Sequence, residues 1–307
     1  MSRCAFQDRA VRMLQSPRPD VTRAILAALS LSVLLAVVPA STPRPLAALA
    51  ARLDGYVMAV QPVIANQKLW FDLDTGGLHT IVDSSAAKAL QLRSAGSLQI
   101  GGAGKGAVEA LKLLPFAVRL QTVTFYPKDP LALDLSHTGS VIDARGLLGF
   151  DLFSQYVVAY DYDRTAVELY DPATYRYPGA GARIPLVIRP PRAFVSVVVS
   201  APGVAPERHL LRVDTGSSDS VDDDIILRSS EPKKILTGGV GIGSRFKTYV
   251  GTISSLQIGP YVLHQNLVSA TGGVQLIGGD VWHRFNIVFD FAHRCMYLAP
   301  RRHFTKS

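Results

Sequence analysis

The chain has 307 residues, of which 48% are hydrophobic and 18% charged. It is long enough for two domains with their own cores, which excludes a disulfide-stapled mini-protein and a wholly disordered chain. The formal net charge is +8, of which the five Arg and two Asp of residues 1–40 supply +3. The remaining basic residues form no helix-turn-helix, zinc or RNA-binding motif, so we expect no nucleic-acid partner.

Residues 1–40 have the pattern of a signal peptide. Basic residues from Arg3 to Arg23 precede an uncharged apolar run of 15 residues, Ala24 to Val38, which ends near the small-residue site at Ala40. This run is shorter than the roughly 20 residues that span a bilayer. We therefore expect a periplasmic or secreted protein, attached to a membrane only if the apolar segment is retained. Alternatives are cleavage at Ala48-Leu49-Ala50 and a start at Met13.

Beyond the leader, short apolar runs rich in Val, Ile, Phe and Tyr alternate with Gly, Pro and Asp, which predicts a mostly β protein with few helices. The expected strands include residues 56–64, 113–120, 156–160, 194–199 and 244–250. Two short helices are expected, at residues 84–90 behind an Asp83/Ser84 cap and at residues 222–228 behind acidic residues. Without Cys4, Cys295 has no partner for an intramolecular disulfide.

An internal repeat is the most informative feature of the sequence. Asp74-Thr75-Gly76 matches Asp214-Thr215-Gly216, Leu147-Leu148-Gly149 matches Leu276-Ile277-Gly278, and Gly101-Gly102-Ala103-Gly104 matches Gly238-Gly239-Val240-Gly241. Since three matches occur in the same order, the chain is predicted to contain two copies of one β unit. We place an N-terminal lobe at residues 53–174, a linker at 175–182 and a C-terminal lobe at 183–300.

The two Asp-Thr-Gly triplets, each followed by an apolar-apolar-Gly motif, resemble the aspartic proteases. The paired glycine loops resemble retropepsin flaps, whereas pepsin-like enzymes have one flap. Plain hairpin turns are the alternative interpretation of these loops. The resemblance implies an all-β protein with two homologous β-barrel lobes, a cleft between them and the complete site in one chain. We therefore expect a monomer that hydrolyses peptide or protein substrates without a metal or cofactor.

The resemblance also implies residue roles. Asp74 and Asp214 are the expected catalytic pair, because two carboxylates about 3 Å apart share one proton and can act as base and acid. Thr75 and Thr215 should cross-bond the loops, and Gly76, Gly216 and Ser217 should support the pair. The expected flap residues, which would bind substrate, are Gly101, Gly102, Gly104, Gly238, Gly239 and Gly241.

Two residues near the first triplet bear on the expected catalytic pair: Gly77 departs from the family pattern, and Asp72 adds a nearby carboxyl group. Gly77 stands where the first triplet usually continues with Ser, Thr or Ala, so one hydrogen bond to the carboxylate should be missing. Asp72 lies two residues before Asp74 on the same strand face and could raise the pKa of the catalytic pair.

Other interpretations remain open. The main alternative is a non-catalytic bilobal protein of the same fold that binds peptides. Asp72-Leu73-Asp74 resembles the nucleophile motif of Mg²⁺-dependent haloacid-dehalogenase-type phosphatases, but the alternating helices of that fold are missing. Asp219 and Asp222 to Asp224 lack the spacing of a calcium loop, and residues 101–106 lack the Ser/Thr and helix of a phosphate loop.

Overall fold

A computed structural model describes residues 43–101, 106–136, 142–238, 246–264, 268–270 and 274–302. These described residues belong to one compact unit. The predicted signal peptide, residues 1–40, lies outside the described residues. Within the described part of the chain, no helix is both long and apolar enough to cross a membrane.

The described structure is all-β, as predicted, with three sheets and four short helices. None of the sheets closes on itself in the described part of the chain, so the structure differs from the β-barrel lobes that we expected while the all-β class is confirmed. The helices are α1 (Ser84–Ala89), α2 (Phe150–Phe153), α3 (Gly279–Trp282) and the 3₁₀ helix η1 (Asp224–Arg228).

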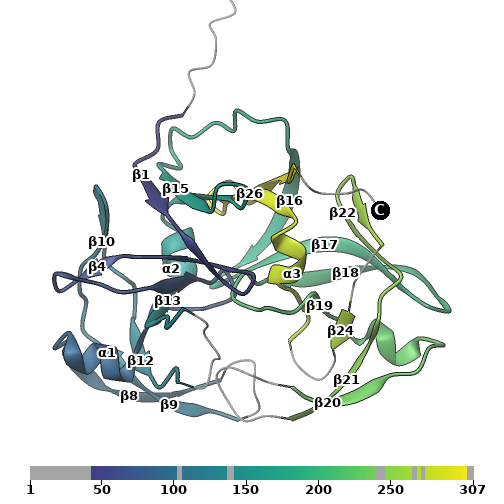
Figure 1. The fold of residues 1–307 in the computed structure, drawn as a ribbon, viewed down its shortest axis with the longest axis horizontal. Helices are drawn as coiled ribbons and strands as arrows, with labels where there is room; N and C mark the ends of the chain where they lie inside the picture. The colour runs from purple at the N-terminus through teal and green to yellow at the C-terminus, as the bar shows by residue number, and fades with distance from the viewer. Residues whose placement is uncertain are drawn as a thin grey trace, which may run out of the picture. The chain divides into compact units, whose positions relative to one another are not determined.

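The first half contains an eight-stranded and a four-stranded sheet (Figure 1). In spatial order the larger sheet consists of β2 (Arg52–Asp54), β3 (Val57–Val60), β6 (Phe71–Leu73), β13 (Gly146–Leu148), β7 (Ile81–Asp83), β12 (Leu131–Leu133), β9 (Val108–Leu113) and β8 (Ser94–Ile100). The smaller sheet consists of β11 (Val123–Phe125), β10 (Val118–Leu120), β4 (Val63–Ile64) and β5 (Gln67–Lys68).

The third sheet has 15 strands and contains elements of both halves. Its order is β1 (Ala47–Ala50), β15 (Ala166–Tyr170), β14 (Val157–Asp161), β26 (Phe285–Asp290), β27 (Cys295–Pro300), β16 (Ala182–Arg189), β17 (Arg192–Ala201), β18 (Val204–Val213), β25 (Leu276–Ile277), β19 (Val221–Asp222), β24 (Val268–Ala270), β21 (Phe246–Thr252) and β20 (Lys234–Gly238). Beside this path, β22 (Ser255–Ile258) pairs with β17 and β23 (Tyr261–Leu263) pairs with β22.

The sequence repeat is also a repeat of topology. The path β6-β13-β7-β12-β9-β8 in the first half has the same order as β18-β25-β19-β24-β21-β20 in the second. The directions agree too, since β6 is parallel to β13 and β7 to β12, just as β18 is parallel to β25 and β19 to β24. Both Asp-Thr-Gly triplets therefore follow equivalent strands, β6 and β18.

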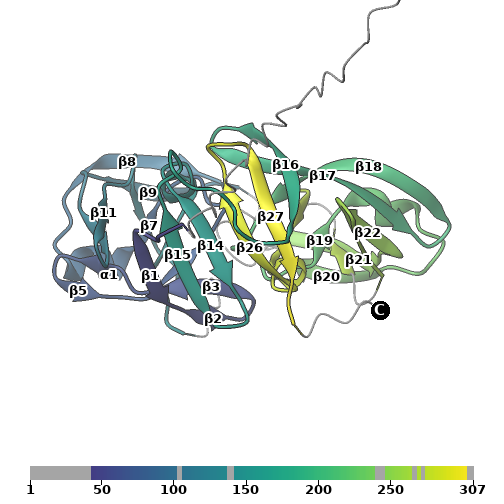
Figure 2. The same cartoon turned by 90° about the horizontal axis from the view of Figure 1, so that it is seen from above.

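The halves meet where β14 pairs with β26 in an antiparallel ladder. Figure 2 shows β14, β26 and β27 between the strands of the first half and those of the second. Aromatic side chains from both halves pack at this junction, with Phe289 in edge contact with Phe153 and with Tyr160. All three are at most 1% exposed. The interface between the halves is therefore part of the hydrophobic core.

Candidate active site

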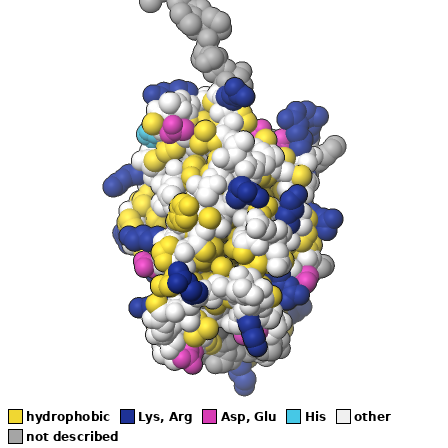
Figure 3. Space-filling model, turned by 90° about the vertical axis from the view of Figure 1, so that its left-hand side faces the viewer, with side chains coloured by type: hydrophobic (Ala, Val, Ile, Leu, Met, Phe, Trp, Pro, Cys, Tyr) yellow, Lys and Arg dark blue, Asp and Glu magenta, His cyan; other side chains and the backbone are white. Residues whose placement is uncertain are grey.

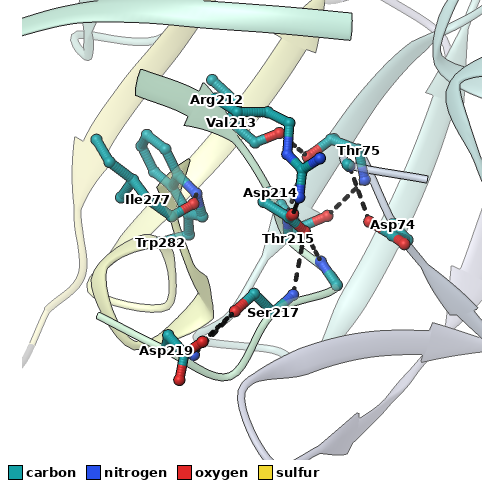
Figure 4. A network of polar contacts seen from close by, with 12 residues as sticks. Asp74, Thr75, Arg212, Val213, Asp214, Thr215, Ser217, Asp219, Ile277 and Trp282 are labelled. Carbon is teal, nitrogen blue, oxygen red and sulfur yellow. Dashed lines mark hydrogen bonds and ion pairs between the residues drawn. The ribbon is translucent and has the colours of Figure 1, made fainter. Parts of the chain in front are cut away.

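The two Asp-Thr-Gly segments are bonded to each other through their threonines (Figure 4). The backbone N–H of Thr75 donates to Oγ1 of Thr215, and the N–H of Thr215 donates to Oγ1 of Thr75, both at 3.0 Å. Each hydroxyl donates in turn to a carbonyl on the opposite strand, Thr75 to Val213 at 2.9 Å and Thr215 to Leu73 at 2.8 Å. Both threonines are completely buried. This is the cross-bonding that the resemblance implied.

The glycines of the triplets show how closely the loops approach. A Cβ on Gly76 would lie 2.5 Å from Oδ1 of Asp214, and a Cβ on Gly216 would lie 2.5 Å from Oδ1 of Asp74. Real Cβ atoms do not approach an oxygen this closely, so both positions require glycine. Each triplet therefore presents its glycine to the carboxylate of the other, and Asp74 and Asp214 are brought together as predicted.

The apolar-apolar-Gly segments lie behind the loops, as expected. The N–H of Asp74 donates to the carbonyl of Leu148 at 3.0 Å, and the N–H of Asp214 donates to that of Ile277 at 3.1 Å. A Cβ on Gly149 would come within 2.5 Å of the carbonyl oxygen of His79, so a larger residue would displace the first loop. These segments fix the backbone from which each aspartate projects.

Asp74 lies in a buried site beside the carboxylate of Asp214, which changes its pKa. Burial, and then the charge of Asp214, raise the pKa of Asp74 to about 7, although Arg212 and the N–H groups of Gly76 and Gly77 act in the opposite direction. Like charges in a poorly solvated site disfavour double ionisation. Over the acidic to neutral range, the geometry therefore favours a pair that holds one proton.

Arg212 is a site residue that the sequence analysis missed. Its Nη2 donates to Oδ2 of Asp214, and both side chains are buried, with residue exposures of 8% and 5%. The signal was present, because Arg212 stands two residues before Asp214 and residues i and i+2 of a strand share a face. The prediction made from this spacing concerned only Asp72 in the first half.

Ser217 supports Asp214 through its backbone, and its side chain does not take part. Its N–H donates to Oδ1 of Asp214 at 3.1 Å, whereas its hydroxyl donates to Asp219 at 3.1 Å. At Gly77, a Cβ would lie 2.8 Å from Oδ2 of Asp74. Gly77 therefore offers Asp74 no side-chain donor, whereas the side-chain donor to Asp214 is Arg212 rather than Ser217.

Asp72 lies close to the pair, but the pKa that its charged neighbours raise is that of Asp72 itself. Burial, followed by the charges of Asp54 and Asp74, raises the pKa of Asp72 to about 8. Its Oδ1 is buried and has no hydrogen-bond partner. Asp72 is therefore a protonated carboxyl at neutral pH. The raised pKa of Asp74 is explained by burial and Asp214.

The flap interpretation stays a prediction. Gly101 directly follows β8 and Gly238 ends β20, whereas Gly102, Gly104, Gly239 and Gly241 lie outside the described residues. The hairpin β20–β21 exposes apolar side chains, since Ile235, Leu236 and Tyr249 are 60%, 52% and 46% exposed. Ile235 and Leu236 therefore give this hairpin an exposed apolar surface.

A cavity of about 390 Å³ lies beside η1 and contains neither catalytic candidate. It is lined by His209, Leu210, Asp223, Asp224, Ile225, Arg228 and Gln275. Asp223 has a local role, because its Oδ1 caps η1 by accepting from the N–H of Ile225 at 2.8 Å. No cluster of three or more His, Cys, Asp or Glu that could hold a metal occurs among the residues described.

No protein-family model matches the chain, and no curated protein matches its sequence. The arrangement of the two triplets therefore carries the functional argument.

Proposed function

We propose that this protein is an aspartic endopeptidase whose catalytic residues are Asp74 and Asp214. One observation carries the proposal: each triplet's glycine faces the carboxylate of the other triplet, while the two threonines bond the loops together. A turn that served only its own half would not need this exchange. Two carboxylates that share one proton provide a base and an acid in one place.

In the proposed reaction, a water molecule lies between the carboxyl groups. The water oxygen bonds to the peptide carbonyl carbon while the ionised carboxylate takes one proton from this water. At the same time the protonated carboxyl gives its proton to the carbonyl oxygen. The resulting diol collapses when the C–N bond breaks. The carboxyl that took the water proton then gives it to the leaving amine. The other carboxyl recovers a proton from the diol, so the pair returns to its starting state.

The pKa of Asp74 predicts the alkaline limit of the activity. The pair works with one proton, and the loss of that proton above a pKa of about 7 leaves no acid. Cleavage should therefore fall about tenfold per pH unit well above pH 7. Activity should extend from acidic pH to near neutrality.

The proposal includes an extended peptide or protein substrate, paired along strand edges and covered by the glycine flaps. It also includes export through residues 1–40 to the periplasm or the exterior. On the face of the molecule shown in Figure 3, Lys and Arg side chains are scattered among hydrophobic ones.

The test is cleavage of a mixed peptide library by the purified protein, followed by mass spectrometry from pH 3 to 9. Cleavage that pepstatin inhibits, and that Asp74→Asn purified in the same way does not show, supports an aspartic peptidase. A contaminating protease would be equally abundant in both preparations. Cleavage that is unaffected by Asp74→Asn and by pepstatin would overturn the proposal.

The alternative is a peptide-binding protein of the same fold that does not cut. One observation favours it, because Arg212 neutralises Asp214 within the pair. Such a protein would bind library peptides and release them intact at every pH. Asp74→Asn would leave that binding essentially unchanged.

A further inference from the structure

The second half carries a buried cation, Arg212, beside its catalytic candidate, whereas the described residues of the first half place none beside Asp74. Nη2 of Arg212 donates to Oδ2 of Asp214. Oδ1 of the same carboxylate accepts from the N–H groups of Gly216 at 3.2 Å and Ser217 at 3.1 Å. Both oxygens of Asp214 are therefore engaged by donors, one of which is charged. Such donors favour the ionised form of a carboxylate.

Asp74 is held differently. Its Oδ1 accepts from the N–H of Gly76 at 2.8 Å, and its donors are backbone groups. No salt bridge to Asp74 occurs in the described structure. Of the two carboxylates, Asp214 is the better stabilised as an anion.

The difference arises at equivalent positions of the repeat. Asp72 is bonded in register to Leu147, and Arg212 is in register with Leu276, the matching residue of the second half. The position two residues before each catalytic candidate is thus acidic in one half and basic in the other. The sequence is asymmetric at this position although the two loops are bonded symmetrically.

Arg212 is placed here at an energetic cost, which argues for a role beyond stability. Its Nε is buried and has no hydrogen-bond partner. A buried donor without a partner destabilises the fold. Its strand neighbours across the ladder, Phe194 and Leu276, are apolar.

We propose that Arg212 is a positioning residue that assigns the roles within the pair, keeping Asp214 as the carboxylate that accepts the water proton and leaving the shared proton on Asp74. This inference rests on the proposed peptidase function. In the reaction above, Asp214 then takes the proton from water and later gives it to the leaving amine. Asp74 gives its proton to the carbonyl oxygen and recovers one from the diol.

Other ionisable groups around the pair, with the exception of Asp219, are compatible with this assignment. Those that act on the pair or on its near neighbours are Asp54 from β2, Asp72 from β6, Tyr160 and Tyr162 from β14 and the turn that follows it, and Asp219 from the loop after Asp214. The pKa values of Asp72 and both tyrosines are raised, which keeps these groups neutral near pH 7. Burial, and then the charge of Asp214, raise the pKa of Asp219, so Asp219 acts against an ionised Asp214. Arg212 acts in the opposite direction and is in direct contact with Asp214.

The direct test does not require cleavage. In protein labelled with ¹³C at the aspartate carboxyls, with signals assigned through Asp74→Asn and Asp214→Asn, the two carboxyls should give different signals from pH 5 to 6, because only one of them holds the shared proton. Asp74 should report a protonated one that titrates near pH 7. The reverse pattern would overturn the inference, even if the protein cleaves no peptide.

The kinetic test compares Arg212→Met with Arg212→Lys, after circular dichroism has verified that each is folded. Loss of the positive charge raises the proton affinity of both carboxyls, so the pH optimum of Arg212→Met should rise by about one to three units. Arg212→Lys keeps the charge and should shift the optimum less. An Arg212→Met profile that is uniformly lower but has the wild-type optimum would indicate a structural role only and contradict the inference. A wild-type protein without Asp74-dependent cleavage would instead contradict the peptidase function, and the labelled-carboxyl titration would still decide the role of Arg212.

Discussion

Gly76 and Gly216 each face the carboxylate of the opposite triplet, which makes their missing side chains part of the site. Many glycines serve local turns by adopting a positive φ. These two instead provide space, because an added Cβ would meet an oxygen of Asp74 or Asp214 at 2.5 Å. Any enlargement at either position must displace the facing carboxylate or one of the two loops.

Gly76→Ala should therefore reduce peptide cleavage at least about 100-fold, since small displacements of reacting groups cost this much. Gly251→Ala is the matched control, because its Cβ would make ordinary contacts, the nearest at 3.5 Å from Ile226 and Lys233. Initial rates on one peptide at the pH optimum are the measurement. Equal rates for Gly76→Ala and the wild type would be incompatible with the described loop contact.

Asp72 should make the folded state sensitive to pH. Its pKa is raised from 3.8 to about 8 by burial, Asp54 and Asp74. Between these two values the folded state binds a proton that the unfolded state has lost. The free energy of unfolding should consequently fall as pH rises from about 4 to 8, by at most about 1.4 kcal/mol per unit for this group.

Asp72→Asn should remove this contribution, so its stability relative to the wild type should increase steadily from pH 4 to 8. Urea unfolding at several pH values measures the trend, and its slope is independent of any constant cost of the new amide. The exposed Asp129→Asn controls for loss of a carboxylate elsewhere. A difference between Asp72→Asn and the wild type that does not change with pH would contradict the raised pKa.

At the level of elements, the threonines link β6 and β18 across the junction. Replacing Thr215 by Val keeps the shape of the side chain but removes two hydrogen bonds. One is donated by the backbone N–H of Thr75 to the Thr215 hydroxyl, and the other is donated by that hydroxyl to the carbonyl of Leu73. The carbonyl of Leu73 retains a bond from the hydroxyl of Tyr160 at 3.2 Å, whereas the N–H of Thr75 loses its partner.

We expect Thr215→Val to lower the free energy of unfolding by about 2 to 4 kcal/mol, because two buried bonds are lost and a donor is left unpaired. Thr215→Ser retains the hydroxyl and should cost clearly less. Chemical denaturation of the two variants provides the comparison. Equal stability of Thr215→Val and the wild type would show that the cross-bonds contribute little.

Elements with strong local signals were predicted best. The helix expected at residues 84–90 is α1, and Asp83 caps it by accepting from the N–H groups of Ser85 and Ala86. The helix expected at 222–228 was wrong in type and start, because Asp222 belongs to β19 and Asp223 caps the 3₁₀ helix η1. The strand expected at 113–120 is divided, since Leu113 ends β9 and β10 begins at Val118, with Pro115 between them.

Contacts between segments far apart in the sequence could be predicted only where the repeat indicated them. The matching triplets predicted that Asp74 and Asp214 would meet, although 140 residues separate them. The pairing of β14 with β26 and the open sheets could not be read from local periodicity, because strand partners are chosen by tertiary packing. Arg212 was missed because a single charged residue in a strand is ordinarily taken as exposed.

For the whole molecule, the shared sheet predicts that one chain carries the complete site. The ladder between β14 and β26 and the aromatic contacts of Phe289 join the halves in one core. Activity per molecule should therefore stay constant when the protein is diluted from micromolar to nanomolar concentration. A fall in specific activity that follows dimer dissociation in sedimentation experiments would contradict a monomeric enzyme.

The central claim is that Asp74 and Asp214 act as one unit, and a double-mutant cycle tests it most directly. Cleavage rates of one peptide should be measured for Asp74→Asn, Asp214→Asn and the double variant. We predict that each single change lowers kcat at least about 1,000-fold and that the double change costs no more than either one, as for residues that act together. Losses that multiply in the double variant, or a single variant that retains wild-type activity, would contradict the account.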